Sequence, residues 1–345
     1  MATPVTPQQR LDILAGFADA MPDPCLIVDR RSILLHANRP ATGEFGGLVE
    51  GSLLTLGLRH PALLSAIDAV RRTGQGRSVE LHQTVPNETW HRADVALLPD
   101  FDGALVITMR NLSEHKRLEQ LRSDFIANAS HELRTPLTSL VGFIDTLLGP
   151  AAKDEGARER FLTIMRQQAG RMSALIDDLL SLSRIEMRQH MKPVGTVDIA
   201  HLLNEVAEGL ETQAREAGLT IVVAPSEPVS INGDRNELYE VFENLMDNAI
   251  KYGGDGGTVD VAVGPGRAGH DYAVTVTDHG AGIEPQHVPR LTERFYRVDA
   301  ESSRKKKGTG LGLAIVKHIV HRHRGLLTIK SAPGEGTRVE VLLNR

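Results

Sequence analysis

A histidine followed directly by an acid stands out in the run Ser130-His131-Glu132-Leu133-Arg134-Thr135-Pro136-Leu137. A neutral imidazole can attack phosphorus through one nitrogen if a neighbouring group holds the proton on the other nitrogen and absorbs the charge that develops. Glu132 is placed to do this. Thr135 lies one helical turn beyond His131, where its hydroxyl could orient a water against a phosphorylated ring. These residue types at this spacing predict a phosphate acceptor.

Apolar residues on either side place this histidine on a packed helix. The expected seam steps by four and three residues through Leu133, Leu137, Leu140, Ile144 and Leu147. His131 falls outside that seam, so we expect its ring to face solvent. Pro136 has no amide hydrogen and crowds the preceding turn, which predicts a helix bend just past the histidine. A helical histidine taken alone is more often an ordinary surface or core residue, and the acid and the threonine are what favour an acceptor.

A stripe of amides and an ammonium is expected on a later helix that begins near Asp234. Asn244, Asn248 and Lys251 are four and then three residues apart, so their side chains share one face. Magnesium takes one or two protein oxygens and fills its shell with water and phosphate, so the Asn248 amide is the expected ligand. Lys251 can hold phosphate oxygens, and Tyr252 can pack on a sugar or base. The alternative is a solvated helix face, although asparagine is a mediocre helix former.

Three glycine-rich turns follow that helix. The alternating segment Tyr272–Asp278 predicts a strand that ends in His279-Gly280-Ala281-Gly282-Ile283, and Asp278 can accept a hydrogen bond from the exocyclic amine of adenine. Gly308-Thr309-Gly310-Leu311-Gly312-Leu313 then opens an apolar helix, so backbone amides at its N-terminus are expected to face phosphate. Gly334-Glu335-Gly336-Thr337 precedes a final strand. A lone glycine motif is weak evidence for a nucleotide site. Here the motif follows the asparagine-bearing helix and the Asp278 turn, and this order of segments strengthens the prediction.

The residues around His131 resemble the dimerisation and phosphoacceptor domain of bacterial sensor histidine kinases, whose motif reads H-E-x-x-T-P. The resemblance extends from about Leu112 to the C-terminus, and the run Phe125–His131 looks most like the phosphate-regulon sensor kinases. It implies that His131 is the phosphoacceptor, that Glu132 is its acid/base partner, and that Thr135 takes part in the reverse phosphatase reaction.

The later segments look like the N, G1, G2 and G3 boxes of the ATP-binding fold that histidine kinases share with Hsp90-type chaperones and type II topoisomerases (the GHKL or Bergerat fold). This resemblance implies ATP and magnesium as cofactors, with Asn248 as the magnesium ligand. The ATP-binding residues that it implies are Asn244, Asn248, Lys251, Tyr252, Asp278, Gly280, Gly282, Ile283, Arg297, Arg304, Gly308, Thr309, Gly310, Leu311, Gly312, Leu313 and Thr337.

The segment Glu293–Asp299 is similar to the F box of this family, which anchors a lid over the triphosphate. The lid, Ser302–Lys307, is more basic than the family pattern and has Lys307 where a first glycine is common. Any one of its lysines also fits a solvated charge run. Arg297 and Arg304 are the better candidates for phosphate contact because a guanidinium can hold two phosphate oxygens at once.

The composition is that of an ordinary soluble, ordered chain of 345 residues, with 41% hydrophobic and 24% charged residues. A net charge of -5 argues against a nucleic-acid or anionic-membrane surface. A single cysteine, Cys25, excludes an internal disulfide, and His318, His321 and His323 predict a solvated helix end rather than a zinc cluster. No apolar run approaches the roughly 18 residues that span a bilayer, so we expect a cytoplasmic chain as given. Many relatives of the family that it resembles carry membrane segments ahead of this region. Two alternatives stay open: such segments are naturally missing here, or the chain is a fragment of a parent protein that could be membrane-associated.

The front of the chain predicts a compact mixed domain with five strands, and its layout is similar to a PAS sensor domain. Trp90 and Phe101 are expected in its core. Its sequence has no cysteine or histidine that would commit it to haem or flavin. A dimerisation and relay module is therefore favoured over a cofactor sensor, and both remain open.

We expect a multidomain α+β protein with a PAS-like domain at 1–111, a helical hairpin at 112–190 and an α/β sandwich that binds ATP at 191–345. Two hairpins would bury both apolar seams as a four-helix bundle, so a homodimer is expected. The second seam is Met172, Leu175, Leu179 and Leu182. The expected activity is an ATP-dependent protein-histidine kinase that phosphorylates His131. The partner is then the receiver domain of a separate response regulator, which the resemblance implies to be a DNA-binding protein of the phosphate-response type, while this chain binds no nucleic acid itself.

Two rival functions differ in class from a kinase. An ATP-gated chaperone or topoisomerase would lack the His131 motif and generally has a catalytic glutamate where Asn244 stands. A binding scaffold with decayed kinase activity would have lost some of the expected polar residues, and all of them are present. The stimulus, the balance of kinase and phosphatase, and transfer within or between subunits stay open.

Overall fold

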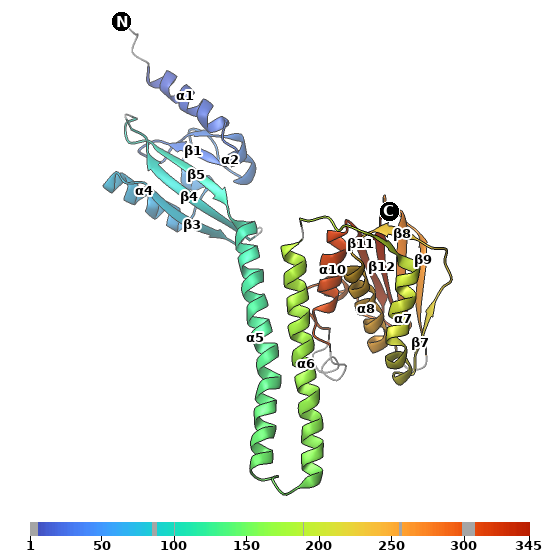
Figure 1. Ribbon diagram of the computed structural model, residues 1–345. Coiled ribbons are helices and arrows are strands. Elements are labelled where there is room, and N and C mark those ends of the chain that lie inside the picture. Colours follow the sequence, from blue (N-terminus) through green and yellow to red (C-terminus); the bar gives the residue numbers. More distant parts are fainter. Residues whose placement is uncertain (1–5, 85–87, 100, 189, 255–256, 299–307) are drawn as a thin grey trace. The chain divides into compact units, whose positions relative to one another are not determined.

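The computed structural model describes residues 6–345 except 85–87, 100, 189, 255–256 and 299–307 (Figure 1). The chain divides into two compact units, Met1–Asp124 and Phe125–Arg345. The long helix α5 (Ser113–Leu148) runs through the boundary between them. Each unit has its own hydrophobic core.

The first unit is a five-stranded antiparallel sheet with helices between its second and third strands, in the order β2-β1-β5-β4-β3. Its strands are β1 (Cys25–Val28), β2 (Leu34–Ala37), β3 (Arg77–Gln83), β4 (Thr89–Leu97) and β5 (Leu105–Asn111). Its helices are α1 (Pro7–Asp19), α2 (Arg39–Glu44), α3 (Leu54–Gly57) and α4 (Pro61–Thr73). The five strands agree with the number that the sequence predicts for this region, and the identity of the unit as a PAS domain stays a prediction.

Strand β4 shows why this sheet has one buried face. His91, Ala93 and Val95 are buried and alternate with exposed residues, because successive side chains of a strand point to opposite faces. Trp90 does not lie in the core as expected. It is half-buried, and its ring stacks on His82 with 4.0 Å between ring centroids. Phe101 is also only half-buried.

The second unit begins with a helical hairpin formed by α5 and α6 (Glu155–Met187) (Figure 1). Asp154 caps α6 by accepting a hydrogen bond from the Ala157 amide. Helix α5 continues through Pro136, which is buried, although proline leaves the Glu132 carbonyl without its usual amide donor. Among the described helices, none has a stretch long and apolar enough to cross a membrane.

Much of the predicted hairpin seam is exposed in a single chain. Leu137 is 51% exposed and Ile144 is 42% exposed, whereas Leu175 and Leu182 of α6 are buried. Further exposed apolar residues on the two helices are Val141, Leu148, Leu162, Ile176 and Leu180. A second copy packed as a four-helix bundle would cover such a face. The homodimer stays a prediction.

The rest of the second unit is a five-stranded mixed sheet packed against helices. The strand order is β11-β12-β10-β9-β7, and only the β7–β9 pair is parallel among the described strands. The strands are β7 (Thr220–Val223), β9 (Thr258–Pro265), β10 (Tyr272–Asp278), β11 (Leu326–Ala332) and β12 (Gly336–Leu343), with β6 (Thr196–Asp198) paired to β8 (Ser230–Asn232). The helices are α7 (Ile199–Glu216), α8 (Arg235–Tyr252) and α10 (Gly312–Arg322), with the short 3-10 helix η1 (Val288–Arg290).

Helices α7, α8 and α10 share one core with the sheet. Phe242 of α8 and Ile315 of α10 are fully buried, together with Val259 and Val341 of the strands. Asp234 caps α8 by accepting hydrogen bonds from the amides of residues 236 and 237, so the helix begins where the sequence predicts. The helical hairpin and the α/β sandwich of the expected fold are both present, and they position the site described below.

Candidate functional site

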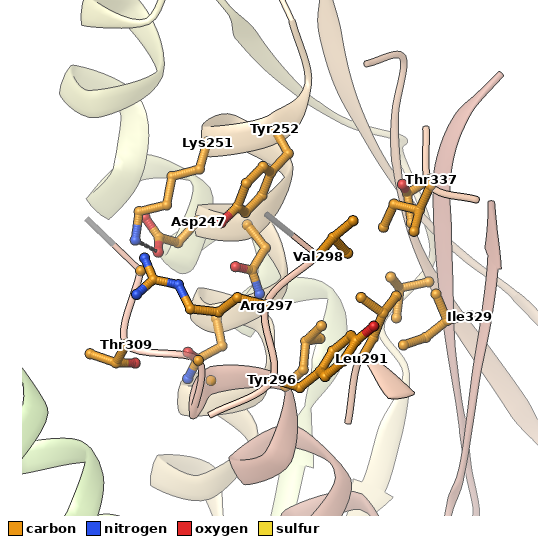
Figure 2. Close-up of a pocket in the computed structure, with 18 of the residues that line it drawn as sticks. Asp247, Lys251, Tyr252, Leu291, Tyr296, Arg297, Val298, Thr309, Ile329 and Thr337 are labelled. Atoms are coloured by element: carbon orange, nitrogen blue, oxygen red, sulfur yellow. Dashed lines mark hydrogen bonds and ion pairs between the residues drawn. The ribbon is translucent and has the colours of Figure 1, made fainter. Parts of the chain in front are cut away.

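A cavity of about 500 Å³ lies between α8, the strand ends and the glycine turns of the second unit (Figure 2). Lys251, Asp247, Arg297 and Thr309 lie on one side of it, and Ile329 and Thr337 lie on the other (Figure 2). The first side therefore carries two cations that phosphates could contact, with Asp247 beside Lys251, and the other side carries apolar and hydroxyl groups that suit a base.

Helix α8 contributes the predicted polar stripe to this cavity. Asn244, Asn248 and Lys251 all line it. The Asn244 amide nitrogen donates to the Glu240 carbonyl at 2.9 Å, which fixes the orientation of the amide. Lys251 forms an ion pair with Asp247 of the preceding turn (Figure 2). The helix therefore presents one amide with a fixed orientation, that of Asn244, and a lysine with a partner.

Asp278 ends β10 and is buried against the cavity. Its Oδ1 accepts the amide hydrogens of Gly280 at 3.0 Å and Thr337 at 3.2 Å. Burial raises the pKa of this carboxyl above its ordinary value, while the two backbone hydrogen bonds act in the opposite direction. Both bonds end on Oδ1, so Oδ2 is the oxygen to which an adenine amine could donate.

The first glycine turn lies too close to other backbone for a side chain. A Cβ on Gly280 would lie 2.1 Å from the Tyr252 carbonyl oxygen. Gly282 has a φ of +70°, and a Cβ there would lie 1.8 Å from the Ala332 oxygen. The next amide, that of Ile283, donates to the Ser331 hydroxyl at 2.9 Å. These contacts hold Gly282 and Ile283 at the cavity wall.

The second glycine turn leads into α10. Gly308, Thr309, Gly310, Gly312 and Leu313 line the cavity. Two predicted ATP-binding residues do not line the cavity: Leu311, which is fully buried, and Gly280 of the first glycine turn. The Thr309 hydroxyl donates to Asp178 of α6 at 2.6 Å, and Asp178 also lines the cavity. The predicted phosphate loop is therefore in contact with the helical hairpin.

The predicted acceptor residues lie together on α5. His131 is exposed, as expected from its place outside the seam. The Thr135 hydroxyl donates to the His131 carbonyl at 3.2 Å, so it contacts the backbone of the histidine in this structure. The carboxylate of Glu132 is largely buried against two arginines, Arg171 of α6 at 3.2 Å and Arg297 at 3.9 Å.

The F-box segment connects the cavity to the acceptor helix. Arg297 lines the cavity and is the same side chain that approaches Glu132. Two residues earlier, the Phe295 ring packs against Phe125 of α5 with 5.8 Å between ring centroids. Arg304 and the predicted lid, Ser302–Lys307, lie outside the described residues.

His323 differs from its predicted place at a solvated helix end. Its side chain is buried, with Nδ1 2.9 Å from the Ile319 carbonyl oxygen and Nε2 accepting the Asp234 amide hydrogen at 3.0 Å. Burial lowers the pKa of this imidazole. In the part of the chain that the structure describes, no group of three or more His, Cys, Asp or Glu residues could hold a metal ion.

Comparisons with known families agree with this geometry. Residues 121–188 match the His Kinase A (phospho-acceptor) domain, and this segment contains His131. Residues 233–345 match the histidine kinase-, DNA gyrase B-, and HSP90-like ATPase, and this segment contains α8 and the glycine turns. The phosphate regulon sensor protein PhoR of Pseudomonas aeruginosa is 41% identical over 235 residues. The chain belongs to the sensor histidine kinases.

Other relatives of this sensor histidine kinase carry different names. The sensor-like histidine kinase SenX3 of Mycolicibacterium smegmatis is 35% identical over 71% of the chain, and the sensor protein kinase WalK of Staphylococcus aureus is 34% identical over 70%. The PhoR match covers 67% of the chain but only 52% of PhoR, and the other two cover 64% and 58% of those relatives. Among solved structures, the Acinetobacter baumannii histidine kinase AdeS matches 62% of the chain and 97% of its own, with 25% identity and a TM-score of 0.49.

Several cavity residues of this sensor histidine kinase were not predicted from the sequence. Asp247 could have been found, because it lies four residues before Lys251 on the same helical face. Ala174 and Asp178 reach the cavity from α6, and Ile329 and Val339 reach it from β11 and β12. Only the packing of these elements brings them there, and no local pattern marks them.

Proposed function

We propose that the chain binds Mg-ATP in this cavity and transfers the γ-phosphoryl group to His131. The observation that carries the proposal is the ion pair between Arg297, which lines the cavity, and Glu132, which directly follows the acceptor. One arginine thus links the proposed nucleotide site to the proposed acceptor. The proposed domains are a PAS-like domain at 1–111, the hairpin at 112–190 and the ATP-binding domain at 191–345.

The cavity residues suit the parts of ATP in order. Asp278 receives the adenine amine at the base end, with Tyr252 beside the base or sugar. Lys251 and Arg297 hold phosphate oxygens at the other end, and the turn from Gly308 to Leu313 offers backbone amides there. Arg304, which lies outside the described residues, is proposed as a further phosphate contact.

The described oxygen donors fit a magnesium ion whose other ligands would be phosphate oxygens and water. Asn248 offers one hard amide oxygen at the cavity, and the described residues hold no acidic cluster that would form a full metal site. When bound, magnesium neutralises charge on the phosphates. The residues of the chain then supply position and further positive charge, which is most of what phosphoryl transfer requires.

The transfer at His131 forms one bond and breaks one. The unprotonated ring nitrogen attacks the γ-phosphorus, and the bond from that phosphorus to the bridging oxygen breaks so that ADP leaves with the electron pair. The proton on the other ring nitrogen passes to Glu132, which leaves the phosphorylated ring neutral. His131 is exposed, which lets the phosphoryl group be passed on.

The phosphohistidine is expected to transfer its phosphoryl group to an aspartate on a separate response regulator. The similarity of the chain to PhoR supports a regulator that binds DNA and belongs to the phosphate-response type, and it supports signalling in phosphate starvation. We further propose phosphatase activity toward that regulator, with Thr135 taking part, a homodimer through the hairpin seam, and a relay role for the first unit.

Label from the terminal phosphate of ATP tests the proposal. The purified chain is incubated with magnesium and ATP labelled at the γ-position, and in parallel with ATP labelled at the α-position. We expect label on the protein from the γ-position only, and its loss in acid but not in base, as for phosphohistidine. Stable label in acid, or equal label from both positions, would contradict phosphoryl transfer to a histidine.

A further inference from the structure

The Glu132 carboxylate lies between two guanidinium groups from different parts of the second unit. Its Oε2 accepts a hydrogen bond from Arg171 Nη2 at 3.2 Å. The same oxygen lies 3.9 Å from Arg297 Nη1. The three side chains are partly shielded from water, with exposed fractions of 29% for Glu132, 23% for Arg171 and 13% for Arg297.

The two arginines differ in what else they can reach. Arg171 is within hydrogen-bond distance of Glu132, whereas Arg297 is beyond it. Arg297 lines the cavity and Arg171 does not. A triphosphate in the cavity would carry more negative charge than one carboxylate, so it would draw Arg297 away from Glu132. Arg171 would then remain as the cation that holds the carboxylate.

Helix geometry explains why Glu132 needs such a partner. Neighbouring residues on an α-helix point about 100° apart around its axis and do not face each other. A glutamate that takes a proton from the preceding histidine must therefore be held in one conformation out of several. A guanidinium offers its donors in a rigid fork. When it holds one carboxylate oxygen in place, the direction in which the other oxygen points is also restricted.

We propose that Arg171 is a positioning residue for phosphoryl transfer to His131. It holds Oε2 of Glu132, so that Oε1 receives the ring proton while Arg297 turns to the phosphates. This inference rests on the proposed function and adds a residue from α6 to it. The competing explanation is that Arg171 merely ties α5 to α6 and stabilises the hairpin.

Four variants of the whole chain separate these explanations: Arg171→Gln, Arg171→Lys, Glu132→Gln and the double variant of Arg171→Gln with Glu132→Gln. Arg166→Gln is the matched control, since it changes an exposed arginine on the same helix. The rate of His131 labelling at saturating ATP, the ATP concentration for half-maximal rate and the thermal unfolding midpoint are measured for each.

We expect Arg171→Gln to lower the saturated rate about tenfold or more, as for loss of a charge-assisted hydrogen bond. The ATP concentration for half-maximal rate should change less than about twofold, and Arg171→Lys should recover part of the rate. If Arg171 acts through Glu132, the double variant should be no slower than Glu132→Gln, because the two effects would not add. Arg166→Gln should behave as the wild type.

Two outcomes would overturn the inference. One is a wild-type rate for Arg171→Gln. The other is that Arg171→Gln lowers the rate by the same factor in the wild-type chain and in the Glu132→Gln chain. Arg171 would then act independently of Glu132, as a residue that only ties α5 to α6. A wild-type chain that takes up no label would instead contradict the proposed function, and the inference would fall with it.

Discussion

Gly312 leaves no room for a side chain beside Asn244, because a Cβ on Gly312 would lie 2.5 Å from the Asn244 amide oxygen. Gly312 is the first residue of α10, and Asn244 lies in the middle of α8. Because Gly312 has no side chain, the Asn244 amide can occupy the space beside it. This close approach joins the second glycine turn to the stripe of amides on α8.

Gly312→Ala should weaken nucleotide binding about tenfold or more, because the new methyl group must push the Asn244 amide out of place. The overpacking should also lower the free energy of unfolding by about 1–3 kcal/mol. Titration calorimetry with ATP and a denaturant series measure the two effects. Gly264→Ala is the control, since a Cβ on Gly264 of β9 would meet no atom within 4 Å. Similar behaviour of both variants would argue against the Asn244 contact.

Asp278→Asn should change the preference for the base. The Asn side-chain oxygen can still accept from the amides of Gly280 and Thr337, as Oδ1 does now. The amine of the new side chain would meet the amine of adenine, so ATP affinity should fall about ten- to hundredfold. ITP, which has a carbonyl in place of that amine, should lose much less. An equal loss for ATP and ITP would remove Asp278 from base recognition.

Asp178→Asn should increase both stability at neutral pH and nucleotide affinity. Burial is the largest cause that raises the pKa of Asp178 above 3.8, so the folded chain favours the protonated acid. The protonated Asp178 therefore makes the free energy of unfolding larger than the ionised form does. This gain is fully present below pH 3.8 and is lost as pH rises through the raised pKa. Asparagine avoids the loss, so the variant should be the more stable at pH 7 and the difference should shrink in acid.

Removal of the Asp178 charge should also tighten ATP binding by about three- to tenfold, because one charge at contact range in water is worth on the order of 1 kcal/mol. Urea titrations at several pH values and an ATP titration check both effects. Asp177→Asn, which changes an exposed acid beside it, is the control. A variant that is less stable at pH 7 and binds ATP more weakly would mean that the Thr309 contact outweighs the charge.

Thr135→Ala should separate the kinase from the phosphatase. If the hydroxyl orients water during hydrolysis, its loss should slow dephosphorylation of the regulator by about 10- to 100-fold and leave labelling of His131 largely unchanged. The hydroxyl also donates to the His131 carbonyl, so it could instead help to set the helix just before Pro136. If that bond sets the helix, both activities should fall together. The labelling rate and the half-life of the phosphorylated regulator, measured on one preparation, decide between the two roles.

The elements of the fold could be predicted because their signals are local. The stripe of Asn244, Asn248 and Lys251 marks α8, and the alternation of Tyr272–Asp278 marks β10 with the same bounds in the structure. Part of the cavity lining, on α8 and in the glycine turns, also follows from motifs that are short in sequence. Their roles toward ATP remain predictions that the variants above test.

Contacts between distant segments could not be predicted. Asp178 is 131 residues from Thr309, and Arg171 is 39 residues from Glu132, so no local period connects either pair. The prediction that His323 is solvated was wrong. It rested on the cluster of histidines and arginines around it, which is typical of a helix end. The burial of His323 depends on the Asp234 amide 89 residues away, which gives its ring nitrogen a partner.

The central claim is that His131 receives the phosphoryl group from ATP bound in a separate domain. His131→Gln tests it most directly, by measuring acid-labile label from γ-labelled ATP together with the affinity for ATP. We predict no label and an affinity within about twofold of the wild type, because the acceptor lies on α5 and does not line the cavity. Acid-labile label that persists in the variant would contradict the account.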